Sequence, residues 1–141
     1  MNAAPIAFRE NEMKPPESHQ DLLHRPLFAH FATVRPDGGP QVNPMWFVYD
    51  AESNRIRLTH TKTRHNYRFL KEEPRVALSI TDPEDQYRYL QVRGEIEKEE
   101  DDPEGSFYQL LQKRYRGQTS EVTDRDVRVV YTVRPTAWKV R

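Results

Sequence analysis

A basic run over residues 58–74, LTHTKTRHNYRFLKEEP, holds the side chains best suited to binding a charged ligand. Its second half is typical of a short helix that begins at about Thr63 and is ended by Pro74. The first turn of a helix carries a partial positive charge, so acidic residues usually occupy it. Here cations stand at the start, and the acidic pair Glu72 and Glu73 stands at the far end. Each charge placed in this way costs up to about 1 kcal/mol at an exposed helix end.

A bound anion would make this reversed polarity tolerable. Free backbone N–H groups at a helix N-terminus are a ready site for phosphate or carboxylate. Lysine and arginine add charge there, and threonine hydroxyls add hydrogen-bond donors. The candidate cradle for a multiply charged anion consists of Thr59, Thr61, Lys62, Thr63 and Arg64. The alternative is a solvated turn in which the cations only keep a strand edge soluble.

A second candidate feature is the run QVNPMWFVY over residues 41–49. Proline inside a strand is confined to edges and bulges, so Pro44 predicts a kink in this strand. A kinked strand that carries Met45 and Trp46 beside exposed backbone amides could hold a flat heterocycle. The alternative is an ordinary core strand with Trp46 and Val48 pointing inward, and the run alone favours that interpretation.

Other kinds of chemistry find no support in the sequence. The absence of cysteine excludes disulfides, thiolate nucleophiles and iron–sulfur clusters. His60 and His65 are too far apart for a helical metal pair, and His30 stands alone in a predicted strand, so no metal site is predicted. No Ser-His-Asp, paired-acid or phosphate-loop pattern occurs, and Gly38-Gly39 is typical of a turn.

Composition narrows the possible partners. Lys plus Arg and Asp plus Glu number 22 each, so the chain lacks the basic excess that a nucleic-acid-binding protein needs. Only 35% of the residues are hydrophobic, which favours an oligomer that shares its apolar surface. No run is long and apolar enough to span a membrane, and the N-terminus lacks a secretory signal. We therefore expect a soluble, cytoplasmic protein.

The elements that must position these residues form one predicted domain over residues 18–141, after a flexible, proline-containing arm over residues 1–17. Ser18 is expected to cap a short helix that ends near Pro26, and a second helix is expected between Asp102 and Gly117. Short connections favour antiparallel strands, and apolar residues on both faces suggest a closed or half-closed barrel. Alternation predicts six strands, at 27–35, 41–49, 55–61, 75–82, 87–99 and 127–133.

The order of these segments resembles a known family. FATVRPDGGPQVNPMWF (31–47) and LTHTKTRHNYRFLKEEPRVALSITDPEDQYRYLQVRGEIE (58–97), with the closing strand, are similar to the pyridoxamine 5'-phosphate oxidase-like split β-barrel flavoproteins. Within them the chain looks most like the small branch that uses the deazaflavin coenzyme F420. The resemblance covers about residues 18–141. It implies a mainly β, α+β fold: a six-stranded antiparallel split β-barrel of the FMN-binding type, with short flanking helices.

The resemblance also implies a homodimer with two equivalent cofactor sites at the subunit interface. Residues 41–46 and the end of strand 55–61 would flank the cofactor ring, and the basic turn would meet its phosphate and acidic tail. Two arginines of the strand 87–99 are implied to reach the site from the partner chain. The implied cofactor-binding residues are Gln41, Val42, Asn43, Pro44, Met45, Trp46, Thr59, His60, Thr61, Lys62, Thr63, Arg64, Asn66, Arg68, Arg88 and Arg93.

The basic turn departs from the family pattern at two positions. Asn66 stands where the family commonly has a second lysine, and Phe69 stands where it has asparagine before leucine. Lys62, Arg64 and Arg68 remain. The missing lysine mildly favours FMN, because FMN has a single phosphate and needs fewer cations.

The implied reaction is hydride transfer from reduced F420 to a small conjugated acceptor. The proton donor stays open among solvent, the cofactor, Tyr87 and Tyr89. The alternatives are an FMN-binding oxidase or reductase of the same fold, a non-catalytic protein that carries the cofactor, and a purely structural barrel. A fold by itself does not choose among them.

Overall fold

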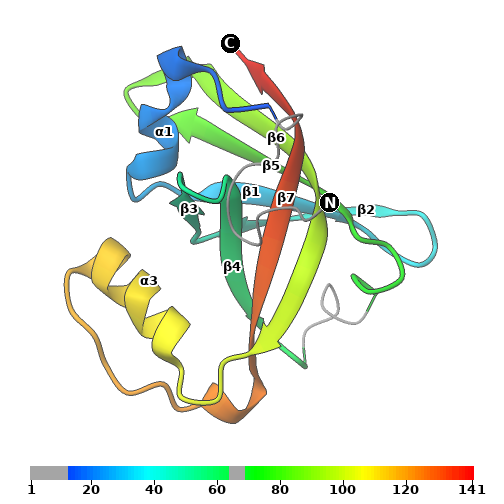
Figure 1. The fold of residues 1–141 in the computed structure, drawn as a ribbon, viewed down its shortest axis with the longest axis vertical. Helices are drawn as coiled ribbons and strands as arrows, with labels where there is room; N and C mark the ends of the chain where they lie inside the picture. Colours follow the sequence, from blue (N-terminus) through cyan, green and yellow to red (C-terminus); the bar gives the residue numbers. More distant parts are fainter. Residues whose placement is uncertain (1–12, 64–68) are drawn as a thin grey trace, which may run out of the picture.

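The structure is a computed structural model that describes residues 13–63 and 69–141. Its main feature is one sheet of seven strands in the order β2-β1-β5-β6-β7-β4-β3 (Figure 1). Every pairing in it is antiparallel, as predicted, and the fold is a split barrel of the α+β class. The strands are β1 (Ala29–Val34), β2 (Pro40–Met45), β3 (Val48–Asp50), β4 (Arg55–Thr61), β5 (Arg75–Asp82), β6 (Asp85–Asp101) and β7 (Arg128–Val140).

The prediction of six strands is wrong by one, because the run 41–49 forms both β2 and β3. Trp46 and Phe47 separate the two strands. Phe47 is buried in the main core, whereas Trp46 packs against a second, smaller cluster outside it. Successive side chains of a strand already point to opposite faces. Here the side chains of Trp46 and Phe47 pack against two separate hydrophobic clusters, and the chain leaves the sheet at these two residues.

This break also closes the barrel. β2 and β3 lie at opposite ends of the strand order, yet only two residues separate them. Three Cα–Cα steps span at most about 11 Å. The sheet must therefore curl until its two edges approach each other, and the residues between β2 and β3 lie at the seam.

The two longest strands, β6 and β7, pair with each other within the strand order, away from its two ends. The last strand was predicted to end at Val133, but β7 continues to Val140. It can do so because Pro135 lies opposite Gly94, at an irregularity in the ladder. Proline is tolerated at such a bulge, where no ladder hydrogen bond is lost. The alternation predicted for β5 is confirmed, since Val76, Leu78 and Ile80 are buried.

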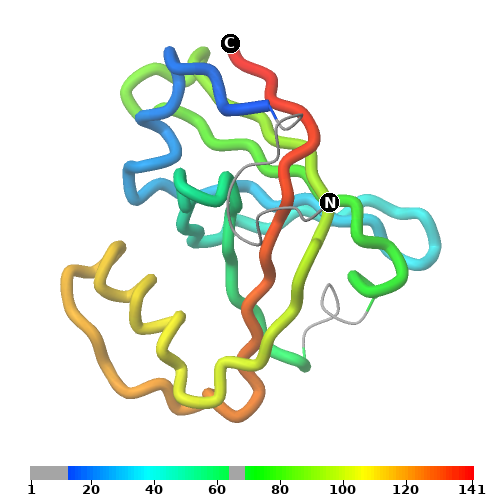
Figure 2. Tube along the Cα trace, in the orientation of Figure 1, coloured from blue at the N-terminus to red at the C-terminus, as the bar shows by residue number. Residues whose placement is uncertain are grey.

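Two short helices, η1 (Glu17–His19) and α1 (Asp21–His24), lie beside the C-terminal end of β7 (Figure 2). The ring of His19 is hydrogen-bonded through Nε2 to the carbonyl oxygen of Arg141, at 2.9 Å. The expected cap at Ser18 is wrong, because this residue lies inside η1 and its hydroxyl pairs with His19 Nδ1. Part of the predicted flexible arm is also held to the barrel, since the Trp138 indole donates to the carbonyl oxygen of Met13 at 3.0 Å.

Arg88 ties α1 to the β5–β6 turn. Its guanidinium donates to Asp21 at 2.6 Å and to Asp82 at 2.9 Å. The hydrogen bond from Arg88 holds the pKa of Asp21 below its usual value. The pKa of Asp82 is lowered first by the backbone N–H of Glu84 and then by Arg88. Arg88 thus has a structural role within its own chain.

These shifts predict how an Arg88→Met variant responds to acid. A carboxyl group whose pKa is lowered in the folded state stabilises that state above its unfolded pKa, and this contribution is lost as pH falls through the folded value. The variant should therefore melt at a lower temperature than the wild type near pH 7. The difference should shrink as pH falls below about 4, the usual pKa of aspartate. Thermal melts followed by circular dichroism across this range test it, and a difference that stays constant with pH would contradict it.

The one long helix of the described chain, α3 (Ser106–Arg116), connects β6 to β7 and stands beside the barrel (Figure 1). It begins later than predicted and its N-cap residue is Gly105 instead of Asp102, but the Asp102 carboxylate still accepts the backbone N–H groups of Phe107 and Tyr108 in the first turn. It ends at Gly117, as predicted, with a positive φ of 80°. A short helix, η2 (Arg125–Val127), precedes β7. Among the described residues, no helix has the length and apolar character to cross a membrane.

Candidate functional site

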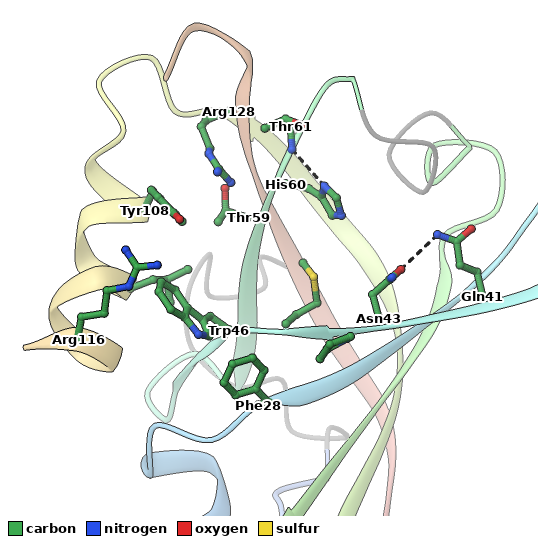
Figure 3. Close-up of a pocket in the computed structure, with 13 residues that line it drawn as sticks. Phe28, Gln41, Asn43, Trp46, Thr59, His60, Thr61, Tyr108, Arg116 and Arg128 are labelled. Carbon is green, nitrogen blue, oxygen red and sulfur yellow. Dashed lines mark hydrogen bonds between the residues drawn. The ribbon is translucent and has the colours of Figure 1, made fainter. Parts of the chain in front are cut away.

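A cleft of about 610 Å³ opens at the seam of the barrel, between β2, β4 and α3 (Figure 3). Its volume lies in the range of small-molecule and cofactor sites, about 300–1,000 Å³. The residues that line it are Phe28, Gln41, Asn43, Pro44, Met45, Trp46, Thr59, His60, Thr61, Tyr108, Leu111, Arg116 and Arg128.

Two open strand edges border this cleft. β2 is an edge strand that pairs only with β1. β3 covers only the first three residues of β4, Arg55–Arg57, so no described strand pairs with the rest of β4 on that side. Pro40 and Pro44 are tolerated in β2 if their nitrogen atoms face its free edge. Val42 lies in step with both prolines, so its N–H faces the free edge and is available to a ligand.

The β4 wall is polar, and part of its hydrogen bonding is internal. The Thr59 hydroxyl donates to the carbonyl oxygen of Val129 at 2.8 Å, so its hydrogen is already used within the fold. The hydroxyl groups of Thr61 and Thr63 pair with each other at 3.0 Å. The backbone N–H of Thr61 donates to His60 Nδ1 at 3.2 Å.

Cations gather where β4 ends. Arg128 lies directly opposite Thr61 in the ladder, and its Nε donates to Asp124 at 3.0 Å. Its guanidinium also lies 4.0 Å from the ring centre of Tyr108. Lys62 follows Thr61 and pairs with an exposed carboxylate of β6 at 3.1 Å. This end of the cleft can therefore offer positive charge and hydroxyl groups to an anion.

The α3 wall consists of aromatic and basic side chains. Trp46 stacks on Tyr115 with ring centres 4.8 Å apart and on Tyr108 at 6.1 Å. The guanidinium of Arg116 lies 4.8 Å from the Trp46 ring centre. The β1–β2 ladder runs through Pro44 without a bulge, so the kink predicted there is not seen, and the chain leaves the sheet only after Met45. Trp46 and Val48 do pack inward, as the core-strand alternative has it, but against the smaller cluster, and Trp46 also lines the cleft.

A tyrosine at the end of α3 anchors this wall to the seam. The Tyr115 hydroxyl donates to the carbonyl oxygen of Leu27 at 2.6 Å and accepts the backbone N–H of Phe47 at 3.1 Å. Burial raises the pKa of Tyr115, so the hydroxyl stays protonated and able to donate. Because Trp46 and Phe47 connect β2 to β3, this contact holds α3 at the point where the barrel opens.

Tyr115→Phe should lower the free energy of unfolding by about 1–3 kcal/mol, because two backbone groups lose their partner while the ring packing is kept. Urea unfolding followed by circular dichroism measures the change. Tyr87→Phe is the matched control, because the Tyr87 side chain is 77% exposed and outside the cleft. Equal changes in the two variants would contradict the anchoring role.

The cleft brings together eight residues of the predicted site, all from β2, β4 and the residue after β2. Val42 is exposed beside them, and Lys62 and Thr63 are exposed just beyond the end of β4. Arg88 and Arg93 lie outside the cleft of their own chain, so their reach into a partner's site stays a prediction. Arg64, Asn66 and Arg68 lie outside the described residues, as does the part of the predicted helix over residues 64–68. Its last part forms turns, since residues 69–72 are not helical.

Sequence reasoning missed Phe28, Tyr108, Leu111, Arg116 and Arg128. They come from the loop before β1, from α3 and from the start of β7. The only local signal was the amphipathic pattern of α3, which identifies a packing face without saying what that face covers. In the described parts of the chain, no three His, Cys, Asp or Glu side chains are grouped so as to hold a metal.

An antiparallel barrel that opens along one seam into a polar and aromatic cleft defines the class of split-barrel proteins. The family model described as pyridoxamine 5'-phosphate oxidase matches residues 15–141, and the chain belongs to this family. No protein with a curated description matches the sequence.

Solved structures agree on the fold. A structure described as an F420 reductase is 51% identical, with a TM-score of 0.83 over 88% of this chain and 98% of its own. A conserved hypothetical protein from Mycobacterium tuberculosis is 18% identical, with a TM-score of 0.72 over 94% of this chain and 87% of its own. General stress protein 26 from Bacillus anthracis is 16% identical, with a TM-score of 0.66 over 88% and 91%. The last two support the fold alone.

Proposed function

We propose that this chain is an oxidoreductase that binds the deazaflavin coenzyme F420 in the cleft at the barrel seam. The observation that carries the proposal is the cleft itself, which combines an open strand edge, flat aromatic walls and a basic end. The 51% identity to a structure described as an F420 reductase supports the choice of cofactor.

The residues present fit such a cofactor. A flat ring system can lie along β2, where Met45 and Trp46 offer apolar contact and the N–H of Val42 offers a donor. Phosphate and carboxylate groups can reach the basic end, where Arg128 and Lys62 lie beside Thr61. The carboxylate partners of both cations are more than one-third exposed, so a bound anion can compete with them in water.

When bound, reduced F420 supplies a hydride, which is one hydrogen with two electrons. A conjugated acceptor such as a quinone takes this hydride and one proton from water, and so becomes the hydroquinone. The protein's part is to orient both molecules and to limit access of water along the aromatic wall. Tyr87 and Tyr89 line no part of the cleft of their own chain, and we propose solvent as the source of the proton.

We further propose that the protein acts as a homodimer. Its apolar content of 35% is low for an isolated domain. Phe28 and Val42 are more than half exposed; Phe28 lines the cleft, and Val42 lies on β2 between two residues that line it, Gln41 and Asn43. A second chain that covers them could bring Arg93, which is exposed, toward the cofactor. Light scattering coupled to size-exclusion chromatography measures the mass, and a monomer of 16.8 kDa would refute this part.

Side-by-side titration of the purified protein with F420 and FMN, followed by cofactor fluorescence, tests the proposal. Tight binding of F420 and weak binding of FMN is expected. The reverse order would favour the FMN enzyme that Asn66 suggests. Tight F420 binding without reduction of any quinone or enone would indicate a carrier, and no binding of either cofactor would leave only the structural barrel.

A further inference from the structure

Two arginines near the end of α3, Arg114 and Arg116, differ in their hydrogen-bond partners. Arg114 donates to four backbone carbonyl oxygens, those of Phe47, Leu23, His24 and Arg25. Arg116 has no hydrogen bond or ion pair within the described residues. Its guanidinium instead lies 4.8 Å from the ring centre of Trp46, at the wall of the cleft. Five N–H donors are therefore presented to the cleft without a protein acceptor among the residues described.

Arg116 also lies apart from the other cation of the cleft. Arg128 and Thr61 lie together at one end, and Arg116 lies on the α3 side of Trp46 (Figure 3). Arg128 is held by Asp124, whereas α3 presents no carboxylate in its last turn, which holds Lys113, Arg114 and Arg116. The cleft thus has two separate basic positions, one beside β4 and one on α3.

A role for Arg116 in helix stability alone does not explain its position. Cations in the last turn of a helix interact favourably with the partial negative charge there. Lys113 already donates to the carbonyl oxygen of Gly117 at 3.2 Å, outside the cleft. Arg116 is exposed and its guanidinium instead lies over the ring of Trp46, an indole that lines the cleft, in a cation–π contact.

We propose that Arg116 binds a carboxylate of the hydride acceptor, so that the preferred substrates are flat conjugated molecules bearing an acidic side chain. This inference rests on the proposed function and adds the substrate class. A guanidinium can hold both oxygens of a carboxylate in a bidentate pair. The rings of Tyr108 and Phe28 provide apolar walls nearby for the conjugated part of the same molecule.

The test uses a matched pair of acceptors, a 1,4-naphthoquinone with a propionic acid side chain and its methyl ester. Binding is measured by quenching of tryptophan fluorescence, in protein without cofactor and in protein with oxidised F420. Reduction of each acceptor by reduced F420 is measured in parallel. The variants are Arg116→Met, which keeps length without charge, and Arg116→Lys, which keeps charge without the planar fork. Lys113→Met is the control, because it removes the same charge from the same helix turn outside the cleft.

Arg116→Met should weaken binding and kcat/KM for the acid by about 10- to 100-fold, the range of a charge-assisted hydrogen bond. Its effect on the ester should stay below about fivefold, the size of an exposed charge effect. Arg116→Lys should recover part of the loss, and Lys113→Met should leave both acceptors unchanged. Circular dichroism melts establish that each variant is folded.

Equal losses for acid and ester, or no loss for either, would overturn the proposal. A weaker affinity of Arg116→Met for F420, with unchanged binding of the acid, would also overturn it and assign Arg116 to the cofactor. Failure of the proposed function is recognised separately, because the wild type would then bind neither F420 nor FMN. The preference for acid over ester in the cofactor-free protein still tests Arg116 in that case.

Discussion

Replacing Lys62 and Arg64 together by alanine should weaken F420 binding by about 100- to 10,000-fold while the fold stays intact. Each side chain is expected to make one charge-assisted hydrogen bond to the cofactor's phosphate or acidic tail, at about 1.5–3 kcal/mol. Lys62 now pairs with Asp101 at 3.1 Å, but both side chains are largely exposed. Such surface pairs contribute little, so Lys62 can exchange its partner for a phosphate.

Fluorescence titration at several salt concentrations measures this effect. The affinity of the double variant should also depend less on salt, because fewer charges take part in binding. Lys71→Ala with Lys98→Ala is the control, since it removes the same charge from two exposed side chains outside the cleft. If the cradle variant binds F420 as tightly as this control does, the basic turn is not the anion site.

Gly94→Val should lower the free energy of unfolding by about 2–4 kcal/mol, because the site has no room for a side chain. A Cβ at this position would lie 2.6 Å from the carbonyl oxygen of Arg134 and 2.8 Å from a methyl group of Val133. The first neighbour is backbone, so it cannot move aside without bending β7. The loss of stability should appear as a lower urea midpoint with a similar m-value.

The control is Ala137→Val, which adds a branched side chain to β7 close to Gly94. Ala137 is exposed and pairs with Arg93, the residue before Gly94. It should change stability by less than about 0.5 kcal/mol, as surface substitutions usually do. A Gly94→Val variant as stable as this control would mean that β6 and β7 do not approach closely at the bulge.

Much of the fold could be predicted from residue patterns. The alternation of Val76, Leu78 and Ile80 identified the buried face of β5. Asp102 and Gly117 bounded α3, although the helix begins at Ser106. These signals are reliable because side chains alternate along a strand and recur every 3.6 residues along a helix, whatever the rest of the chain does. The extra strand was missed because the break at Trp46 depends on what each of two neighbouring side chains packs against.

The residues on one side of the cleft could also be predicted from the sequence. Strand β2 with its prolines and the threonines of β4 were recognised from their types and spacing, and the family resemblance placed them together. The opposite wall was not visible, because Tyr108 and Arg116 approach Trp46 only when α3 folds back over the seam.

The sequence alone determined the fold class, the strand faces and one basic turn, because these depend on local periodicity and on motif order. Only the tertiary structure decided which cations are already paired. Arg88, predicted to bind cofactor, is held by Asp21 and Asp82 in its own chain. Arg116, which no pattern singled out, faces the cleft over Trp46. A side chain's charge is set by its type, but its availability to a ligand depends on neighbours that are distant in the chain.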